Sequence, residues 1–529
     1  MLRSAPAGKK ARARKRRRSL NICVTSCHSN VVKEVAKSMG FKEVDERRLW
    51  NVFWSDASIP IAKATGIKRF QKINHFPGMS EICRKDMLAR NLGRMRKLFP
   101  RDYNFYPKTW ILPEQIRELC ETYYRKRYKV FILKPFLSSR GRGIIISKNL
   151  KGVDLNERLI CQTYPFLIDG FKFDLRIYAL ITSCLPLRIF IYNEGLVRLA
   201  TKKYSLPTDE NITNVYMHLT NYSVNKFSQA FIDDDEQGSK RKISTFNKWL
   251  FDNNYDVKSL WDKIDDMIIK TFLSAHDNLQ HYYMVCFSTL LPHQACFELL
   301  GFDILLDYKL RPFLLEVNHS PSFSTDTKVD QEVKRQLLND TFSILNLNDL
   351  DTAKVLREDK KLCKERLLGL ITEEKKLELL INLATRRKSE MKKSRTQEQW
   401  EEEHMGNFRL IFPTDDSSKY DIYIKESKNY PPQIKHSSKP GLALQKEKSD
   451  NLVGTAEASK NLAAVEPADI KTSSEMDKMA QNKEMESHNN LSKDMSAEPS
   501  RNYGDGQKKK ITRESRESTE KSVPEHKVE

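Results

Sequence analysis

Two carboxylates and an amide stand close together in the stretch GFDILLDYKLRPFLLEVN. Its two apolar runs predict a β-hairpin with Tyr308–Arg311 as the turn, and symmetric pairing then places Asp303 opposite Glu316. Asn318 shares a face with Glu316 because strand side chains alternate. Adjacent carboxylates repel each other unless a proton or a cation lies between them, and such oxygen ligands suit Mg²⁺. The hairpin therefore predicts a magnesium site; the alternative is that one carboxylate faces solvent or pairs with Arg311.

Residues that could bind phosphate lie upstream of this hairpin. Lys134 ends the apolar strand YKVFILKP, where a cation is costly unless it meets an anion. The loop that follows, SSRGRG, offers backbone N–H groups and arginines, although it is not a Walker sequence. Lys172 and Asp174 alternate in FKFDLRIY and therefore share one strand face. Together with the hairpin, these groups predict a site for ATP and Mg²⁺.

The elements that must position these residues mix strands and helices. FKFDLRIYALIT and LRIFIYNEGLVRLA predict two neighbouring strands of a hairpin. A helix is predicted from Ser80, a candidate N-cap, with Leu88, Leu92 and Met95 on one face. Strands and helices do not alternate regularly, so we predict an α+β fold, or a mixed α/β one, and not a doubly wound sheet.

The composition limits the class of protein. The chain has 529 residues, of which 39% are hydrophobic and 30% charged, and its net charge of +21 favours polyanionic partners. Its nine cysteines are scattered singly, as expected in a reducing compartment, and CVTSCH has no second ligand pair for zinc. No apolar run is long enough to span a bilayer, and no apolar segment typical of a secretory signal follows the basic N-terminus. We therefore expect a soluble intracellular protein.

Composition shifts divide the chain into four parts. Residues 1–19 form a basic arm, in which KKARARKRRR is a nuclear-import signal, an electrostatic arm or simply a solvated tail. Residues 20–345 carry the catalytic motifs, and residues 346–405 predict basic amphipathic helices. Residues 406–529 are mostly poor in apolar side chains, and we expect most of this tail to be disordered.

Six motifs together are similar to one family. QKINHFPGMSEICRKDMLARNL, IDGFKFDLRIY, MHLTNYSVNK, GSKRKISTF, ACFELLGFDILLD and LLEVNHSPSFSTD occur in the family's order over about residues 20–345. They resemble the tubulin-tyrosine-ligase-like enzymes, and specifically the tubulin polyglutamylases. The resemblance implies an ATP-grasp-type ligase core and the ATP-dependent ligation of glutamate onto glutamate side chains or chains in tubulin C-terminal tails. It also implies an acyl-phosphate intermediate, Mg²⁺, and microtubule binding by the basic helical extension.

The same resemblance assigns roles to individual residues. It implies that Asp303, Glu316 and Arg176 are catalytic and that Asp303, Glu316 and Asn318 bind the metal. Arg198, Tyr222, Lys242 and His319 match positions that hold the incoming glutamate, whose two carboxylates call for cations. The residues that match nucleotide contacts are Lys134, Arg140, Gly141, Gln162, Thr163, Tyr164, Lys172, Phe173, Asp174, Thr220 and Asn221.

Two departures from the family pattern leave alternatives open. CQTYPFLIDG is shorter than the family's hinge and lacks a lysine, and Pro165 supplies no N–H for adenine. A catalytically impaired microtubule-binding pseudoenzyme is therefore the alternative function. Arg140 resembles branch-initiating members whereas the rest of the chain resembles chain elongators, so initiation and elongation both remain open.

Other functions explain fewer of the residues. Nucleic-acid binding would account for the basic arm but for none of the polar strand faces. Glycine ligation would leave Arg198 and Lys242 without a side-chain carboxylate to bind. We therefore expect tubulin tails and free L-glutamate as partners, no membrane and no nucleic acid. We expect a monomer on cytoplasmic microtubules, with the cilium, axoneme or basal body as candidate locations.

Overall fold

The computed structural model describes residues 20–125, 130–136, 138, 141–148, 159–163, 170–287, 295–347, 352–368 and 397–429. All of them belong to one compact unit, Met1–His436. The basic arm, the loop residue Arg140, the hinge residues Tyr164 and Pro165, and the tail from residue 430 onward lie outside the described residues. Within the described ranges, no helix combines the length and the apolar character that a membrane crossing needs.

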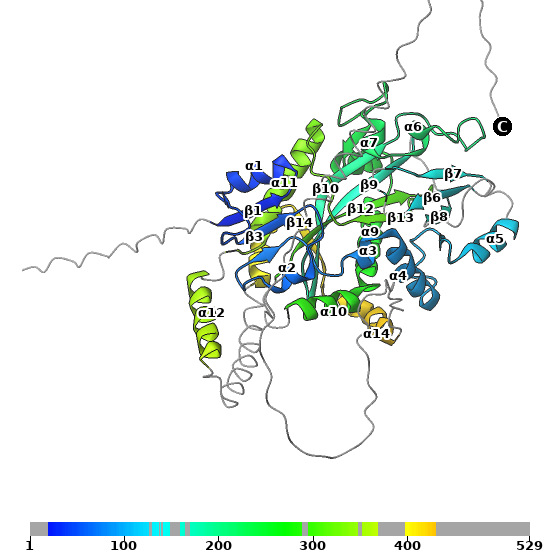
Figure 1. The fold of residues 1–529 in the computed structure, drawn as a ribbon. Helices are drawn as coiled ribbons and strands as arrows, with labels where there is room; N and C mark the ends of the chain where they lie inside the picture. The colour runs from blue at the N-terminus through cyan, green and yellow to red at the C-terminus, as the bar shows by residue number, and fades with distance from the viewer. Residues whose placement is uncertain are drawn as a thin grey trace, which may run out of the picture. The chain divides into compact units, whose positions relative to one another are not determined.

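A central antiparallel sheet carries most of the polar motifs. Its strand order is β11–β10–β9–β12–β13, and β14 pairs with β10 outside this path. Figure 1 shows β9, β10, β12 and β13 in the middle of the ribbon. The strands are β9 (Phe173–Cys184), β10 (Leu187–Leu199), β11 (Lys240–Lys242), β12 (Glu298–Leu306), β13 (Pro312–Asn318) and β14 (Phe408–Phe412).

The alternation of side chains along β9 separates the two faces of this sheet. Odd-numbered residues such as Leu175 and Ile177 join a core cluster with Phe272 of helix α9 (Val257–Leu273). Even-numbered residues such as Tyr178 join a second cluster with Leu337 of helix α11 (Lys328–Ile344). On this second face, the preceding even positions are Lys172, Asp174 and Arg176, so the face turns from apolar to polar along the strand.

Besides the central sheet, the structure contains two smaller sheets. A parallel sheet of order β2–β1–β3–β4 contains β1 (Asn21–Ser26), β2 (Lys42–Glu43), β3 (Val52–Ser55) and β4 (Lys72–Ile73). An antiparallel sheet of order β5–β8–β6–β7 contains β5 (Thr109–Ile111), β6 (Phe131–Pro135), β7 (Ile145–Ser147) and β8 (Leu159–Thr163). The predicted strand ending at Pro135 is therefore confirmed as β6.

The remaining helices connect and cover these sheets. Helix α1 (Asn30–Ser38) buries Val31, Val32 and Val35 at helical spacing against α11. The others are α2 (Ile61–Thr65), α3 (Ser80–Cys83), α4 (Lys85–Leu98), α5 (Ile116–Arg125), α6 (Val215–His218), α7 (Tyr222–Asn225), α8 (Ile243–Asp252), α10 (His276–Phe287), α12 (Thr352–Leu367), the 3₁₀ helix η1 (Ser417–Tyr420) and α14 (Asp421–Asn429). The mixture of helices and strands agrees with the predicted α+β class.

One predicted helix is divided in two. The sequence predicts a single helix from Ser80, but Arg84 adopts an extended conformation (φ −81°, ψ 132°) and separates α3 from α4. Its guanidinium instead bonds Asp86 in the first turn of α4, at 2.7 Å. Leu88, Leu92 and Met95 are buried on α4 as predicted. The break makes Lys85 the first residue of α4.

The folded core continues past the boundary predicted at residue 406. β14 pairs with β10 through Phe408–Tyr192 and Leu410–Phe190, and Phe408 is buried. Arg409 donates to Asp265 of α9 at 2.7 Å, and Glu401, in the helical segment 397–404, is fully buried in an ion pair with Arg188 of β10. Residues 397–429 therefore belong to the core. Composition alone missed this because the apolar run at 408–412 is short.

Candidate active site

The predicted carboxylate hairpin is present with Asp303 opposite Glu316, but the pairing near the turn differs by one residue from the predicted symmetric register. Leu306 pairs with Pro312, and a register shift between Asp303 and Ile304 restores the predicted pair. Asp303 of β12 is the Cα partner of Glu316 of β13. Asp307 shapes the turn between the two strands, because its carboxylate accepts the backbone N–H of Arg311 at 2.8 Å and the Arg311 guanidinium at 2.6 Å. Arg311 is thus paired within the turn, and both Asp303 and Glu316 line the same cavity.

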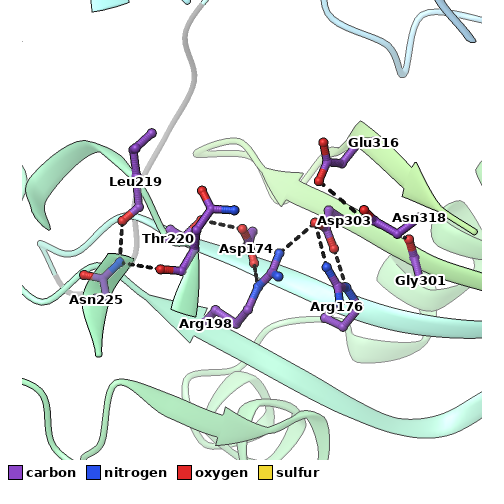
Figure 2. Close-up of polar contacts among 11 residues, drawn as sticks. Asp174, Arg176, Arg198, Leu219, Thr220, Asn225, Gly301, Asp303, Glu316 and Asn318 are labelled. Carbon is purple, nitrogen blue, oxygen red and sulfur yellow. Dashed lines mark hydrogen bonds and ion pairs between the residues drawn. The ribbon is translucent and has the colours of Figure 1, made fainter. Parts of the chain in front are cut away.

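Asp303 is held by two arginines from neighbouring strands. Arg176 Nε donates to Oδ1 at 2.5 Å and its terminal nitrogen to Oδ2 at 3.0 Å, while a terminal nitrogen of Arg198 lies 2.9 Å from Oδ2. Figure 2 shows the three side chains converging across β10, β9 and β12. Burial opposes ionisation of Asp303, but the two guanidinium groups hold its pKa well below its usual value. Asp303 is therefore both buried and ionised at neutral pH.

The oxygen atoms around this hairpin suit a hard cation. The side-chain nitrogen of Asn318 lies 3.4 Å from Oδ2 of Asp303 and 3.5 Å from Oε1 of Glu316, so the amide must turn over for its oxygen to face a cation there. Among the described residues, no group of three or more His, Cys, Asp and Glu side chains could hold a metal ion by itself. Two carboxylates and one amide oxygen fit Mg²⁺, which takes few protein ligands and completes its shell with water or phosphate oxygens.

Cations lie in the cavity beside these carboxylates. Lys134 at the end of β6 and Lys172 just before β9 are both buried. Burial lowers the pKa of Lys134, and burial together with the charge of Lys134 lowers the pKa of Lys172 to about 7. The Lys172 ammonium donates to the backbone oxygen of His218 at 2.6 Å. Two desolvated lysines on one cavity wall create a strong preference for an anion.

Lys85 was not predicted as a site residue. Its ammonium, at the start of α4, lies 3.5 Å from Oε2 of Glu316 and donates to the backbone oxygen of Ser138 at 2.8 Å. It therefore bridges the carboxylate hairpin and the loop after β6. No spacing rule marks this lysine in the sequence, because its contacts are with residues far along the chain.

Asp174 connects Thr220, one of the residues predicted to contact the nucleotide, to Arg198. Its carboxylate accepts a 2.6 Å hydrogen bond from Arg198 Nε and one from the hydroxyl of Thr220. Asn225 of α7 fixes the adjacent turn, since its side-chain amide donates to the backbone oxygen of Leu219 at 2.7 Å and to that of Asn221 at 3.2 Å (Figure 2). The predicted residues of the HLTNYS motif thus reach the cavity.

Gly141 has a conformational reason to be glycine. Its φ is +78°, and a Cβ at this position would lie 3.0 Å from Oδ1 of Asn221. The close approach of the loop to Asn221 therefore requires a residue without a side chain.

The structure brings eight of the predicted site residues to one cavity. Of the predicted nucleotide and metal residues, those that line it are Lys134, Gly141, Lys172, Asp174, Thr220, Asn221, Asp303 and Glu316. The same cavity is also lined by Lys85, Ser138 and Arg142. Gln162 and Thr163 lie on β8, whose side chains are outside the described residues, as are Arg140 and Tyr164.

The side chain of Phe173 does not lie with the other residues that were predicted to contact the nucleotide. As an odd-numbered residue of β9, it turns to the apolar face and packs against Phe246, with ring centroids 5.9 Å apart. A strand residue between Lys172 and Asp174 must point away from them. Only its backbone can contact a nucleotide.

The residues predicted to hold the incoming glutamate are distributed over several elements. Arg198 lies in the network with Asp174 and Asp303, and Tyr222 begins α7. Lys242 of β11 pairs at 2.6 Å with Glu332 and at 3.5 Å with Asp235, so it is not joined to Arg198 in this structure.

His319 follows directly on the carboxylate hairpin. Its ring centroid lies 5.7 Å from that of His75, whose Nδ1 bonds the buried Glu298 at 2.9 Å. Burial and the neighbouring His75 lower the pKa of His319. His319 is therefore held near the cavity as a neutral imidazole at neutral pH.

Comparison with known proteins identifies relatives over most of the chain. Residues 64–354 match the tubulin-tyrosine ligase family. The chain is 48% identical over 428 residues to tubulin polyglutamylase TTLL13 of Mus musculus, covering 79% of this chain and 52% of that protein. It is 48% identical over 412 residues to tubulin polyglutamylase TTLL6 of Homo sapiens (77% and 45%) and 47% identical over 409 residues to tubulin polyglutamylase ttll6 of Danio rerio (77% and 52%). The chain spans about half the length of these curated relatives.

Proposed function

The chain belongs to the tubulin-tyrosine ligase family, and on that premise we propose that it is an ATP-dependent tubulin polyglutamylase. It would ligate glutamate onto glutamate side chains, or onto chains already begun, in the C-terminal tails of tubulin. The names of its relatives, tubulin polyglutamylases at 47–48% identity, support this activity. The fold proposed for a ligase with this activity is an ATP-grasp-type core.

The observation that carries the proposal is the meeting of lysines and carboxylates at one cavity. Lys134 and Lys172 would neutralise a polyphosphate, while Asp303 and Glu316, together with the neighbouring Asn318, would hold Mg²⁺. The metal would supply charge neutralisation during phosphoryl transfer to the acceptor carboxylate. The amine of free glutamate would then attack the acyl carbon, forming the amide C–N bond and displacing inorganic phosphate with loss of a proton, so no nucleophile from the protein is required.

The polarity of the site also supports glutamate as the donor. Arg198, Tyr222, Lys242 and His319 remain the proposed donor residues, and Arg198 lies next to the proposed metal ligand Asp303. In this structure Arg198 pairs with Asp174 and Asp303, and Lys242 pairs with Glu332 and Asp235, so a donor carboxylate would replace one of these partners.

We propose that the basic extension binds the microtubule surface. Helix α12 rests on the core through the buried Val355 and through ion pairs of Glu358 with Arg69 at 2.6 Å and of Asp359 with Lys68 at 3.2 Å. Its exposed basic residues are Lys354, Arg357, Lys360, Lys361 and Lys364. A positive helix face suits the acidic surface that such an enzyme must approach.

One assay tests the proposed function. Purified protein is incubated with microtubules, ATP and labelled glutamate, with glycine and tyrosine in parallel, and the tubulin tails are analysed by mass. We expect added glutamate residues only, and the number on each side chain distinguishes initiation from elongation. Microtubule binding without Mg²⁺·ATP binding at millimolar nucleotide would instead identify a pseudoenzyme.

A further inference from the structure

A second buried charge cluster lies where β11 meets α11. The ammonium of Lys240 lies 2.5 Å from Oδ2 of Asp330, and that of Lys334 lies 2.8 Å from Oδ1. Asp330 is fully buried, and Lys240 and Lys334 are 3% and 4% exposed. One carboxylate therefore serves two buried lysines.

Local structure fixes the position of Asp330. Thr327 is the N-cap of α11, and its oxygen accepts the backbone N–H of Asp330 at 3.2 Å. The Thr327 hydroxyl donates in turn to Oδ2 of Asp330 at 2.9 Å. This reciprocal cap, reinforced by the first turn of α11, leaves the carboxylate little freedom to move.

Lys240 connects this cluster to the proposed donor site. It is the Cα partner of Arg198 in the β10–β11 pair, so the two side chains lie on the same face of the sheet. Its ammonium also lies 3.5 Å from the ring centroid of Tyr222, in cation–π geometry. Arg198 and Tyr222 are both proposed donor residues, and Lys240 stands beside each.

We propose that Asp330 is a positioning residue for the donor amino acid, acting through Lys240 on Tyr222 and on the surface beside Arg198. Asp330 holds the Lys240 ammonium against the aromatic ring of Tyr222. This contact keeps the ring at the proposed donor site. This inference rests on the proposed function, because it concerns the glutamate that the enzyme would use. Helix α11 would thus contribute to donor binding through Asp330, although none of the α11 residues lines the cavity.

Charge and position make opposite predictions for one substitution. Asp330→Asn removes a negative charge close to a site for a dicarboxylate, so charge alone would tighten glutamate binding. If Asp330 positions Lys240, the same substitution releases the ammonium and weakens glutamate binding. The direction of the effect therefore separates the two explanations.

The experiment measures steady-state kinetics and direct binding of L-glutamate in the full chain. We expect Asp330→Asn to raise the KM for L-glutamate by roughly tenfold or more, as for a misplaced binding group. The KM for ATP should stay within about twofold, because the lysines that line the cavity come from β6, from the residue before β9 and from the start of α4, and none comes from β11 or α11. A fall in the glutamate KM, or an equal rise in both KM values, would overturn the proposal.

Two further variants keep the result interpretable. Glu401→Gln removes a carboxylate as deeply buried as Asp330, from an ion pair near the opposite end of β10. It should lower the melting temperature while leaving the ratio of the two KM values unchanged. If Asp330→Asn does not fold, Asp330→Asn with Lys334→Met preserves the local net charge and should show the same selective rise in the glutamate KM.

The outcome is distinct from failure of the proposed function. If the wild-type protein adds no glutamate to tubulin, the function itself is wrong. If the wild type is active and Asp330→Asn binds L-glutamate as tightly as the wild type, only the positioning role is wrong.

Discussion

The guanidinium of Arg198 lies 2.9 Å from Oδ2 of Asp303 and bonds Asp174 through Nε at 2.6 Å. One side chain thus joins the proposed donor end of the site to its proposed metal end. Because all three groups are buried, a change at any one of them alters the charge balance of the others. The predictions below separate these contributions.

Replacing Glu316 with glutamine should abolish glutamate ligation and leave the fold intact. The substitution keeps the size of the side chain but removes the charge that faces Asp303 across the hairpin. Incorporation of labelled glutamate into microtubules is the measurement, and urea unfolding checks the fold. Glu121→Gln, on the exposed face of α5, is the control and should retain activity. Full activity in Glu316→Gln would sink the metal assignment.

Nucleotide binding should take up a proton at Lys172. Its pKa in the protein is about 7, and bound phosphates raise the pKa of a lysine because they favour its charged form. Affinity for ATP should therefore be full below pH 7 and fall as the pH rises, by up to about tenfold per pH unit. Calorimetry in buffers of different ionisation enthalpy detects the proton. Identical binding heats in all buffers would contradict this expectation, and Lys172→Met should reduce the uptake.

Replacing Arg176 with methionine should destabilise the protein. The substitution leaves Asp303 buried with one guanidinium partner where it had two, and breaking a buried pair costs about 3–5 kcal/mol of unfolding free energy. The loss should shrink toward pH 4, since Asp303 can then take up a proton. Urea unfolding at both pH values measures this. Arg311→Met, which removes a largely exposed arginine from the turn, should leave the midpoint nearly unchanged. Equal midpoints for Arg176→Met and the wild type would show that Asp303 is compensated in another way.

A chain shortened to residues 1–405 should not fold, whereas residues 1–436 should. The longer chain keeps five buried aromatic and aliphatic side chains that the shorter one loses: Phe408, Ile411, Phe412, Tyr420 and Tyr423. Each is worth about 1.5–3 kcal/mol, so together they are comparable with the net stability of a domain, about 5–15 kcal/mol. Circular dichroism melts of the two chains test this. A cooperative melt of residues 1–405 near that of 1–436 would contradict it.

Charge reversal on α12 should weaken microtubule binding without affecting the fold. Deleting residues 351–403 would not test this, because it would also remove the buried Glu401. Lys360→Glu with Lys364→Glu changes only exposed residues of α12. Co-sedimentation with microtubules should show weaker binding and a smaller salt dependence. The matched control, Lys258→Glu with Lys263→Glu on α9, should bind as the wild type does; an equal loss in both pairs would mean that overall charge, and not α12, governs binding.

The sequence alone was sufficient where simple strand alternation applies, as in the shared face of Lys172 and Asp174. The pairing of Asp303 with Glu316 was predicted correctly from two apolar runs, but in the structure it depends on a register shift after Asp303 that no turn rule predicts. The same alternation could have excluded the Phe173 side chain from the nucleotide. The family resemblance added the proposed function, because six motifs in order carry more information than any one of them.

Only the tertiary structure revealed contacts between residues that are far apart in the chain. Arg176 and Asp303 are 127 residues apart, Lys240 and Asp330 are 90 apart, and Arg188 and Glu401 are 213 apart. Lys85 reaches Glu316 only because Arg84 is extended and helix α4 begins at the residue after Arg84, which is Lys85 itself. Periodicity and turn chemistry act over a few residues, whereas the pairing of buried charges depends on which elements pack together. Eight of the residues that line the cavity were therefore predicted from the sequence, whereas Lys85 and the partners that hold the site in place were decided by the packing of strands and helices.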